Sequence, residues 1–317
     1  YDHKLPKLDK VRLGFIGVGA RGPGHLDAAM NCEGVEIKAI CDPHLPSANN
    51  AAAMVKKAGR PDAKLYTNGD HDFKRMLANE ELDAVFISTP WEWHVPMSVE
   101  AMKNGVHALV EVPAAITVEG CWELVEVAEQ TKRYCMMLEN VCYGREELMV
   151  LNMCRMGVFG ELLHGEAAYI HDLRGQMHEV GHGTGSWRTL HYAKRNGNLY
   201  PTHGLGPVAQ YMNINRGDRL DYMSSVSSPS RSRRLYADKT FPADHVHRKL
   251  DYVCGDISTT IAKTVGGKTL MIQWDEQLPR PYNRLNLIQG TKGVWGGFPN
   301  RCVIEGETPD THSWVQG

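Results

Sequence analysis

The sequence lacks the features that define several protein classes. Its eight cysteines never form a Cys-x-x-Cys pair and most lie in apolar runs, which argues against a zinc ribbon or a dense disulfide scaffold. No stretch approaches the ~20 consecutive apolar residues of a membrane helix, and no signal peptide is visible. Thirty-five basic against 37 acidic residues leave a net charge of −2, so no charge excess favours nucleic acid or a membrane surface as a partner.

The length of 317 residues is about twice that of a typical domain and predicts two domains, which we expect at residues 1–140 and 141–317. In the first, short apolar runs alternate with segments of helical periodicity. This alternation predicts a parallel sheet with helices on both faces, a doubly wound α/β domain of the Rossmann type. The expected strands are residues 11–18, 36–41, 84–88, 106–110 and 134–139, and the clearest helices are 47–58 and 119–131.

The second part reads as an α+β domain built on a largely antiparallel sheet, entered through a helix at about 146–156. The Gly266-Gly267 pair predicts a two-residue hairpin turn with positive φ at both positions. One helix is expected from Thr202, its N-cap, to about residue 214. The basic stretch 231–234 and the loop through His247 look solvated and mobile. The expected strands are residues 162–170, 222–227, 257–265, 269–274 and 285–288.

The sharpest local motif is the segment Gly17-Val18-Gly19-Ala20-Arg21-Gly22, which follows the first strand and precedes a helix. Gly17 permits a tight turn, Gly19 lets the backbone approach a pyrophosphate, and Gly22 lets helix pack on strand. Asp42 ends the second strand about 20 residues later, where its carboxylate can bind a ribose diol and repel a 2′-phosphate. The pattern therefore favours NAD over NADP; the alternative is a glycine turn with an incidental acid.

Two further segments, which we expect to be loops, follow strands of the predicted parallel sheet. Ligands of such sheets bind outside the carboxyl ends of the strands, so we expect both segments to border the cofactor. For the tryptophans, packing is an equally good interpretation. The segments are Trp91-Glu92-Trp93-His94, after the strand at 84–88, and Glu111-Val112-Pro113, after the strand at 106–110.

Residues 178–182 match the zinc-peptidase pattern His-Glu-x-x-His, which needs both histidines on one helical face. Gly181 and Gly183 and the lack of an amphipathic stripe make a helix here doubtful, so we expect no metal at this motif. His245 and His247 form a second pair, which we interpret as part of a solvated loop.

His203 lies at the start of the expected helix in the second domain. The positive end of the helix dipole disfavours imidazolium and keeps the ring available as a neutral base or hydrogen-bond donor. A histidine that merely caps or packs is the equal alternative.

At the level of the whole chain, the glycine loop, Asp42, the Ser88-Thr89-Pro90 turn and the sheet-rich second domain resemble the sugar-oxidising NAD(P) dehydrogenases typified by glucose-fructose oxidoreductase and inositol dehydrogenase. That group usually has Glu-Lys-Pro after the fifth strand, with the lysine near the reacting carbon. This chain has Glu111-Val112-Pro113 instead, which argues against ordinary alcohol dehydrogenase chemistry.

Longer strings resemble a narrower group, the bacterial NAD-dependent α-N-acetylgalactosaminidases of glycoside hydrolase family 109, over nearly all of the chain. The strings are residues 89–94 (TPWEWH), 111–115 (EVPAA), 137–143 (MLENVCY) and 198–207 (NLYPTHGLGP). Members of that group extend well beyond the position of Gly317, so we expect the family's C-terminal segment to be absent here. Bacterial members of that group often carry export signals, so an exported or periplasmic location is an expectation that rests only on the resemblance.

The resemblance implies two sets of contacts. For NAD it implies Ala20, Arg21, Asp42, Trp91, Glu92, Trp93, His94, Glu111, Val112, Asn140, Arg188 and Tyr200. For a sugar substrate bearing N-acetylgalactosamine it implies Tyr169, Arg188, Tyr200, Pro201, Thr202, His203 and Tyr282.

The implied reaction is a redox route to glycoside cleavage with retention. The sugar is oxidised at C3, loses the C2 proton and the C1 oxygen, gains water, and is reduced again at C3, so no net oxidation occurs. NAD-dependent enzymes are exceptions to the two-carboxylate scheme, and no such carboxylate pair is identifiable here. His203 is our candidate for the C3 hydroxyl and Tyr169 for C2 or the leaving oxygen, although the two roles could be exchanged. Arg188 and Tyr282 are expected to position the sugar.

Three alternatives remain. The first is an oxidoreductase that releases a ketosugar and NADH. The second is a non-catalytic NAD-dependent sugar sensor, and the last is a zinc hydrolase. Whichever function holds, an exposed face of the second sheet would have to be covered, and another subunit is one candidate for covering it.

Overall fold

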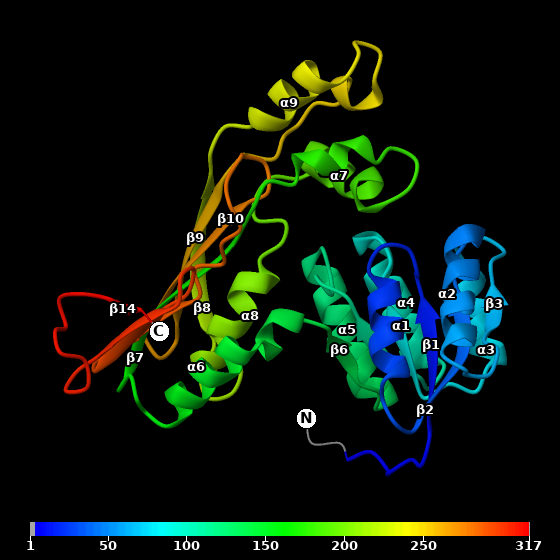
Figure 1. Ribbon diagram of the computed structural model, residues 1–317, viewed down its shortest axis with the longest axis horizontal. Helices are drawn as coiled ribbons and strands as arrows, with labels where there is room; N and C mark the ends of the chain where they lie inside the picture. The colour runs from blue at the N-terminus through cyan, green and yellow to red at the C-terminus, as the bar shows by residue number, and fades with distance from the viewer. Residues whose placement is uncertain (1–3, 317) are drawn as a thin grey trace. The chain divides into compact units, whose positions relative to one another are not determined.

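The computed structural model describes residues 4–316. The chain divides into two compact units, one that ends at Leu138 and one that begins at Glu139 (Figure 1).

The first unit is a six-stranded, fully parallel sheet with strand order β3-β2-β1-β4-β5-β6. The order reverses between β1 and β4, which is the topology of a doubly wound sheet, and the α/β prediction is confirmed. The short strand β3 and the helix after it were not predicted. The strands are β1 (Val11–Ile16), β2 (Val35–Cys41), β3 (Lys64–Tyr66), β4 (Ala84–Ile87), β5 (His107–Val110) and β6 (Cys135–Met137). The helices are α1 (Gly22–Met30), α2 (Leu45–Lys57), α3 (Asp72–Asn79), α4 (Trp91–Lys103) and α5 (Val118–Thr131).

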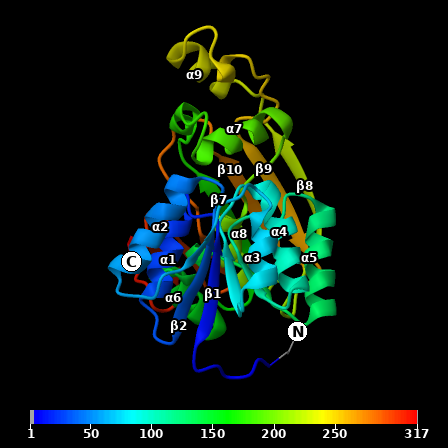
Figure 2. The same cartoon turned by 90° about the vertical axis from the view of Figure 1, so that its right-hand side faces the viewer.

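Both faces of this sheet are buried, which explains the continuous apolar strands in the sequence. Phe15 of β1 joins a core with α1 and α2, whereas the next residue, Ile16, joins a separate core with α3, α4 and α5. Figure 2 shows the two groups of helices on opposite sides of the strands. Successive side chains of one strand therefore supply two cores.

The second unit is an eight-stranded mixed sheet with strand order β14-β13-β12-β11-β7-β10-β9-β8. All neighbouring strands are antiparallel except β7 and β10, which run parallel, so the largely antiparallel prediction is confirmed. The strands are β7 (Leu162–Ile170), β8 (Leu220–Ser227), β9 (Ser258–Thr264), β10 (Thr269–Asp275), β11 (Leu287–Gly290), β12 (Gly293–Gly296), β13 (Arg301–Ile304) and β14 (Val315–Gln316). The helices are η1 (Asn140–Tyr143), α6 (Arg145–Arg155), η2 (Arg174–His178), α7 (Thr184–Lys194), α8 (Thr202–Tyr211), α9 (Ser232–Thr240) and η3 (Val246–Arg248).

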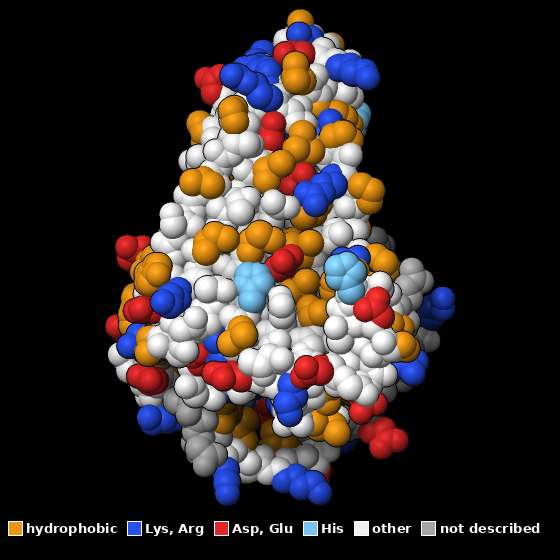
Figure 3. Space-filling view, turned by 90° about the vertical axis from the view of Figure 1, so that its left-hand side faces the viewer, with side chains coloured by type: hydrophobic (Ala, Val, Ile, Leu, Met, Phe, Trp, Pro, Cys, Tyr) orange, Lys and Arg blue, Asp and Glu red, His pale blue; other side chains and the backbone are white. Residues whose placement is uncertain are grey.

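The two faces of this second sheet differ. On one face, Ala167, Ile272 and Ile288 form a core with α6 and α8 (Figure 1). Figure 3 shows hydrophobic side chains gathered on the opposite face, where Val226 and Ile261 are among the exposed large apolar residues. The second face thus carries apolar surface that these helices do not cover.

Two local predictions in this unit are wrong. The hairpin between β9 and β10 has a three-residue loop, because Thr264 N–H donates to Lys268 O at 2.9 Å, and only Gly267 of the glycine pair has positive φ (91°). A three-residue loop needs a left-handed residue only at its last position.

The basic stretch 231–234, which we expected to be solvated, is largely part of the helix α9. Arg233 in this helix is 1% exposed, with its guanidinium 3.5 Å from the centroid of the Tyr192 ring. His247 is buried as well.

The glycine loop of the first unit yields a prediction on stability. A Cβ on Gly22 would lie 2.2 Å from Gly17 O, and such crowding costs about 1–3 kcal/mol. We expect Gly22→Ala to lower the free energy of unfolding by that amount, measured by urea denaturation, and to weaken NAD binding, measured by calorimetry. Gly24→Ala is the matched control, because its Cβ would meet nothing within 4 Å on the same helix. Equal stability of the two variants would contradict the prediction.

Candidate active site

The glycine loop lies between β1 and α1, at the point where the strand order reverses. The chain turns at Gly17, which has φ of 82°, and a Cβ there would lie 2.7 Å from Ser88 O. The helix α1 begins at Gly22, close behind this turn. The start of α1, the positive end of the helix dipole, lies at the carboxyl end of β1 and favours an anion there.

Asp42 stands one residue after β2 and is buried. Its Oδ2 accepts a hydrogen bond from Val18 N–H and its Oδ1 accepts one from His44 N–H, both at 2.8 Å. The carboxylate therefore ties the glycine loop to the end of β2. Each oxygen retains a second lone pair for a ribose hydroxyl.

Glu111, directly after β5, is held as an anion. Its Oε1 accepts from Arg21 Nε at 2.9 Å and lies 2.7 Å from His25 Nε2, and its Oε2 accepts from Val112 N–H at 3.0 Å. Burial alone would raise the pKa of Glu111, but these hydrogen bonds outweigh it and lower the pKa to about 2. Glu111 thereby fixes Arg21 and α1 beside the end of β5.

Residues 91–94 form the first turn of α4 rather than the loop that we expected. The helix begins early because Pro90, in an extended conformation, is its N-cap. The His94 ring nitrogens lie 2.7 Å from Pro113 O and 2.9 Å from Thr89 O, and burial lowers the pKa of this buried imidazole. Trp93 packs edge-on against His71 and Phe73. The packing interpretation thus has direct support, and NAD contacts from this turn stay a prediction.

In the second unit, Tyr169 near the end of β7 is the centre of an aromatic cluster. Its ring centroid lies 4.7 Å from that of His171 and 6.2 Å from that of Tyr282. The rings of Tyr200 and His203 lie at 4.9 and 5.0 Å. The structure therefore brings together four residues that the sequence analysis assigned to the sugar, and adds His171.

His203 has a carboxylate partner that the sequence analysis missed. Its Nδ1 lies 2.6 Å from Oε1 of the buried Glu139, which also accepts from Val141 N–H. A carboxylate at Nδ1 fixes the tautomer that carries the proton there and leaves the lone pair on Nε2. This arrangement is that of a general base with its orienting group, and it favours a role beyond packing for His203.

Tyr169 is a hydrogen-bond donor rather than a phenolate. Burial, and after it the charge of Glu276, raises the pKa of its hydroxyl far above the ordinary value. Burial also lowers the pKa of His171. The cluster thus combines a neutral phenol with a neutral imidazole at neutral pH.

Arg188, on α7, stacks over Tyr200 with its guanidinium carbon 4.9 Å from the ring centroid. Burial alone would lower its pKa, but the carboxylate of Glu276, 3.7 Å away and fully buried, raises it above the ordinary value. Glu276 also accepts a hydrogen bond from Tyr192 OH. The guanidinium is therefore a fixed cation that cannot act as a base.

The sequence analysis did not identify Glu276 and His171 as site residues, because their proximity to Tyr169 depends on strand pairing. In the parallel register of β7 and β10, Tyr169 pairs with Trp274 and Ile170 with Asp275. The carboxyl ends of both strands consequently share one edge of the sheet, with His171 and Glu276 one residue beyond. Their only sequence signal is a polar residue directly after an apolar strand.

The close approach of α8 to β7 depends on Gly204, the third residue of that helix. A Cβ on Gly204 would lie 2.3 Å from Ala168 N, so no other residue allows this helix to lie so near the strand. The helix begins at Thr202 with Pro201 as its N-cap and ends at Tyr211. Thr202 is therefore not the N-cap that we predicted.

Comparison with known proteins assigns both halves of the chain. Residues 11–139 match the family described as "Oxidoreductase family, NAD-binding Rossmann fold". Residues 143–317 match "Glycosyl hydrolase 109, C-terminal domain".

The curated relatives agree. A glycosyl hydrolase family 109 protein of Shewanella sp. strain W3-18-1 is 60% identical over 98% of this chain and 68% of the relative. An α-N-acetylgalactosaminidase of Shewanella oneidensis is 58% identical over the same shares. The chain belongs to glycosyl hydrolase family 109. It is accordingly an NAD-dependent glycosidase with a Rossmann NAD-binding domain.

Solved structures show the same fold at low identity. An NAD-binding oxidoreductase from Klebsiella pneumoniae superposes with a TM-score of 0.74 at 19% identity, over 97% of this chain and 79% of that chain. Scyllo-inositol dehydrogenase from Lactobacillus casei, solved with NAD(H) and scyllo-inositol, superposes with a TM-score of 0.68 at 14% identity, over 97% and 82%.

The residues of this family 109 chain fit NAD. The backbone at Gly17 and Gly22 forms a cradle that a Cβ would fill, the N-terminus of α1 suits the pyrophosphate, and Asp42 suits the ribose diol. Ala20 and Arg21 are exposed at the rim of this loop. Asn140, the first residue of η1, directly follows Glu139 in the second unit.

The His-Glu-x-x-His motif does not form an α-helix. His178 ends η2, and the Glu179 carboxylate accepts a hydrogen bond from Gly185 N–H at 2.6 Å across the following loop. Across residues 4–316, no three His, Cys, Asp or Glu side chains gather closely enough to hold a metal ion. Within the same range, no helix has the length and hydrophobicity to cross a membrane.

The Glu139 carboxylate yields a prediction on activity. Glu139→Gln keeps the side-chain shape but removes the charge that orients His203. We expect kcat for glycoside cleavage to fall roughly 10²–10⁴-fold, the range for general acid-base groups, with NAD affinity unchanged. Glu161→Gln, an exposed carboxylate on the same unit, is the control. Wild-type kcat in Glu139→Gln would remove the base-orienting role.

Proposed function

We propose that this enzyme hydrolyses terminal α-N-acetylgalactosamine from glycoconjugates, with retention, through transient oxidation of the sugar at C3. The hydrogen-bonded pair of His203 and Glu139 beside Tyr169 is the observation that carries the proposal. The specificity has support from the S. oneidensis relative, which is named for this activity.

The first residue role concerns the C3 hydroxyl. His203 Nε2 accepts the proton from O3, while Glu139 stabilises the imidazolium that forms. Bound at the glycine loop, NAD supplies the reversible removal and return of a hydride at C3 of the sugar. The proton returns from His203 to O3 at the end of the cycle, so both groups are regenerated.

The second residue role concerns bond cleavage between C1 and the leaving oxygen. Tyr169 is protonated at neutral pH and donates its proton to that oxygen, and the Arg188 cation stabilises the phenolate left behind. Loss of the C2 proton needs a separate base. His171, which burial keeps neutral beside Tyr169, is the imidazole available for it. When water adds to C1, it gives a proton to the Tyr169 phenolate and His171 returns its proton to C2, so both groups are regenerated.

Arg188 and Tyr282 position the sugar. The guanidinium is fixed between Glu276 and the Tyr200 ring, and the Tyr282 ring meets both Tyr169 and His171 edge-on. Val112 is buried where related dehydrogenases carry a lysine. The absence of an ionisable group at that position favours the glycosidase over release of a ketosugar.

For the assembly, we propose a homo-oligomer that buries the open face of the second sheet. Tyr222, Val226 and Ile261 on β8 and β9 are each at least half exposed and share the face opposite the buried Ala262. Apolar patches of this kind are typical of protein interfaces.

Turnover of p-nitrophenyl α-N-acetylgalactosaminide tests the reaction. We expect nitrophenol release without net accumulation of NADH absorbance, because the hydride returns to the same carbon. His203→Ala should lower kcat by roughly 10²–10⁴-fold while NAD binding persists. Stoichiometric NADH would instead identify a dehydrogenase, binding of both ligands without turnover a sensor, and loss of activity with chelator a zinc hydrolase.

Light scattering after size exclusion tests the assembly. We expect a mass at least twice 35.4 kDa and dissociation by Val226→Glu, which places a charge on the apolar face. Val118→Glu, an exposed apolar position on α5 in the other unit, serves as the control. A monomeric wild-type protein at micromolar concentration rejects the proposal.

A further inference from the structure

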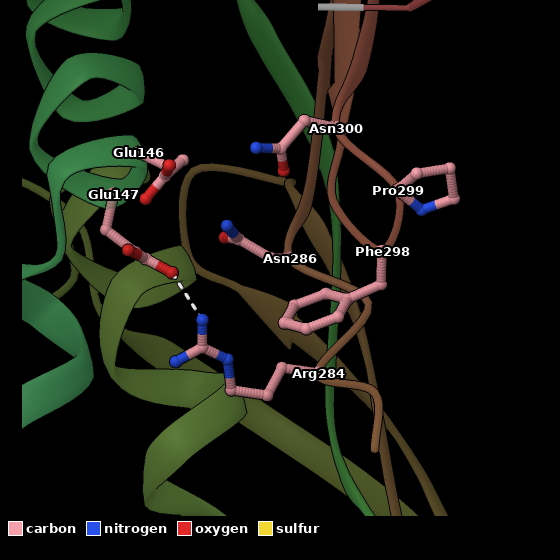
Figure 4. A pocket seen from close by; sticks show the side chains of 7 residues that line it. All are labelled: Glu146, Glu147, Arg284, Asn286, Phe298, Pro299 and Asn300. Atoms are coloured by element: carbon pink, nitrogen blue, oxygen red, sulfur yellow. Dashed lines mark hydrogen bonds and ion pairs between the residues drawn. The ribbon is translucent and has the colours of Figure 1, made fainter. Parts of the chain in front are cut away.

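The second unit contains a pocket that no role assigned so far uses. It has a volume of about 340 Å³ and lies between the start of α6 and the loops that flank β11 and β12 (Figure 4). This volume is at the lower end of the range of ~300–1,000 Å³ for ligand pockets. The six lining residues that carry the argument are Glu146, Glu147, Arg284, Asn286, Phe298 and Asn300.

Two amides point into this pocket with hydrogen-bonding groups to spare. Asn286 is only 4% exposed, and its Oδ1 accepts from Tyr211 OH at 3.1 Å. That bond orients the amide, whose Nδ2 can donate to a group in the pocket. The Asn300 side chain projects from the same side of the pocket, opposite Glu146 on α6 (Figure 4). Among the lining residues, Arg284 Nε is buried without a hydrogen-bond partner within residues 4–316. Buried polar groups are normally paired, so the lining has hydrogen-bonding capacity to spare for a ligand.

An ion pair forms the floor of the pocket. Arg284 Nη2 donates to Glu147 Oε1 at 2.6 Å, and both side chains are largely buried. The guanidinium carbon lies 5.1 Å from the centroid of the Phe298 ring and 5.8 Å from that of Tyr282. Tyr282 and Phe298 also meet directly, with centroids 5.7 Å apart. The pocket therefore adjoins the aromatic cluster around Tyr169 through Tyr282.

The backbone around the pocket is strained. Leu285, Asn286 and Phe298 have positive φ of 58°, 52° and 56°, a conformation that bulky side chains rarely adopt. Gly297 N–H donates to Leu285 O at 3.1 Å and holds the two loops together. Strained residues of this kind cluster at ligand sites, where the surrounding structure maintains them.

The chemistry of the lining selects the class of ligand. The amides and Arg284 donate hydrogen bonds, the Glu146 carboxylate accepts them, and the Phe298 ring offers an apolar surface. Hydroxyl groups, which both donate and accept, match such a mixed set. Two carboxylates against one guanidinium leave one net negative charge, which disfavours a phosphate or an acidic sugar.

We propose that this pocket is the subsite for the leaving sugar, a neutral pyranose linked to the N-acetylgalactosamine that is cleaved. The assignment rests on the proposed function, because it takes the cluster around Tyr169 as the site of the reacting sugar. The enzyme would then recognise two consecutive sugar units, one on each side of Tyr282.

Two substrates that share the reacting sugar test this subsite. One is p-nitrophenyl α-N-acetylgalactosaminide, and the other is a disaccharide of α-N-acetylgalactosamine linked to galactose. We expect Asn300→Ala to lower kcat/KM for the disaccharide about tenfold, the loss of roughly one hydrogen bond, mainly through KM. The value for the nitrophenyl substrate should stay within twofold, which also shows that the variant is folded.

Further variants and a binding measurement make the test decisive. Glu146→Ala should show the same selective loss, whereas Asn152→Ala, an exposed amide elsewhere on α6, should affect neither substrate. Equal losses on both substrates, or no loss on the disaccharide, would overturn the proposal. If the wild type cleaves neither substrate, the proposed function fails, and saturation-transfer NMR with the disaccharide decides the subsite. Saturation transferred from the wild-type protein to the galactose protons should then be lost in Asn300→Ala, and equal transfer in both proteins would reject the subsite.

Discussion

The approach of α8 to β7 is the constraint on which the catalytic geometry depends. Because Gly204 has no side chain, the helix backbone lies directly against the strand at Ala168. This contact brings His203, one residue earlier, to the ring of Tyr169, one residue later on the strand. Glu139 then reaches His203 from the segment just before η1. The proposed base, its orienting carboxylate and the phenol thus come from three segments far apart in the sequence, held by backbone packing rather than by flexible loops.

Buried charge organises the other side of the same cluster. Arg188 would be costly to bury alone, and Glu276 compensates for it. Glu276 in turn is held by Tyr192, over which Arg233 stacks. The proposed catalytic groups therefore lie beside a fixed cation. Negative charge that develops on a phenolate or a leaving oxygen is stabilised by this cation, which is already in place.

The two units supply different parts of one activity. The Rossmann unit carries the glycine cradle and the carboxylates that hold it, and the groups proposed to move protons lie in the second unit. The strained loops around Phe298 extend the second unit beyond the reacting sugar. The sheet holds these loops in strained backbone conformations, and a binding site for a second sugar would account for that strain.

The sequence by itself determined the local structure and the family. The alternation of strands and helices, the glycine turn and Asp42 follow rules that depend on neighbouring residues, so the NAD-binding half could be predicted from pattern alone. His203 could be placed at a helix start, and Tyr169, Arg188 and Tyr282 followed only from the resemblance. The basic stretch was misread because whether an arginine is buried depends on a distant ring such as that of Tyr192.

Only the tertiary structure decided which chemical groups meet. Glu139 and His203 are 64 residues apart, and the parallel pairing of β7 with β10 inside a mostly antiparallel sheet carries no local signal. The pocket at Asn286 likewise depends on loops that follow different strands. Strand order and helix docking are set by the sum of many long-range contacts, whereas periodicity reports only on the nearest turn or pleat.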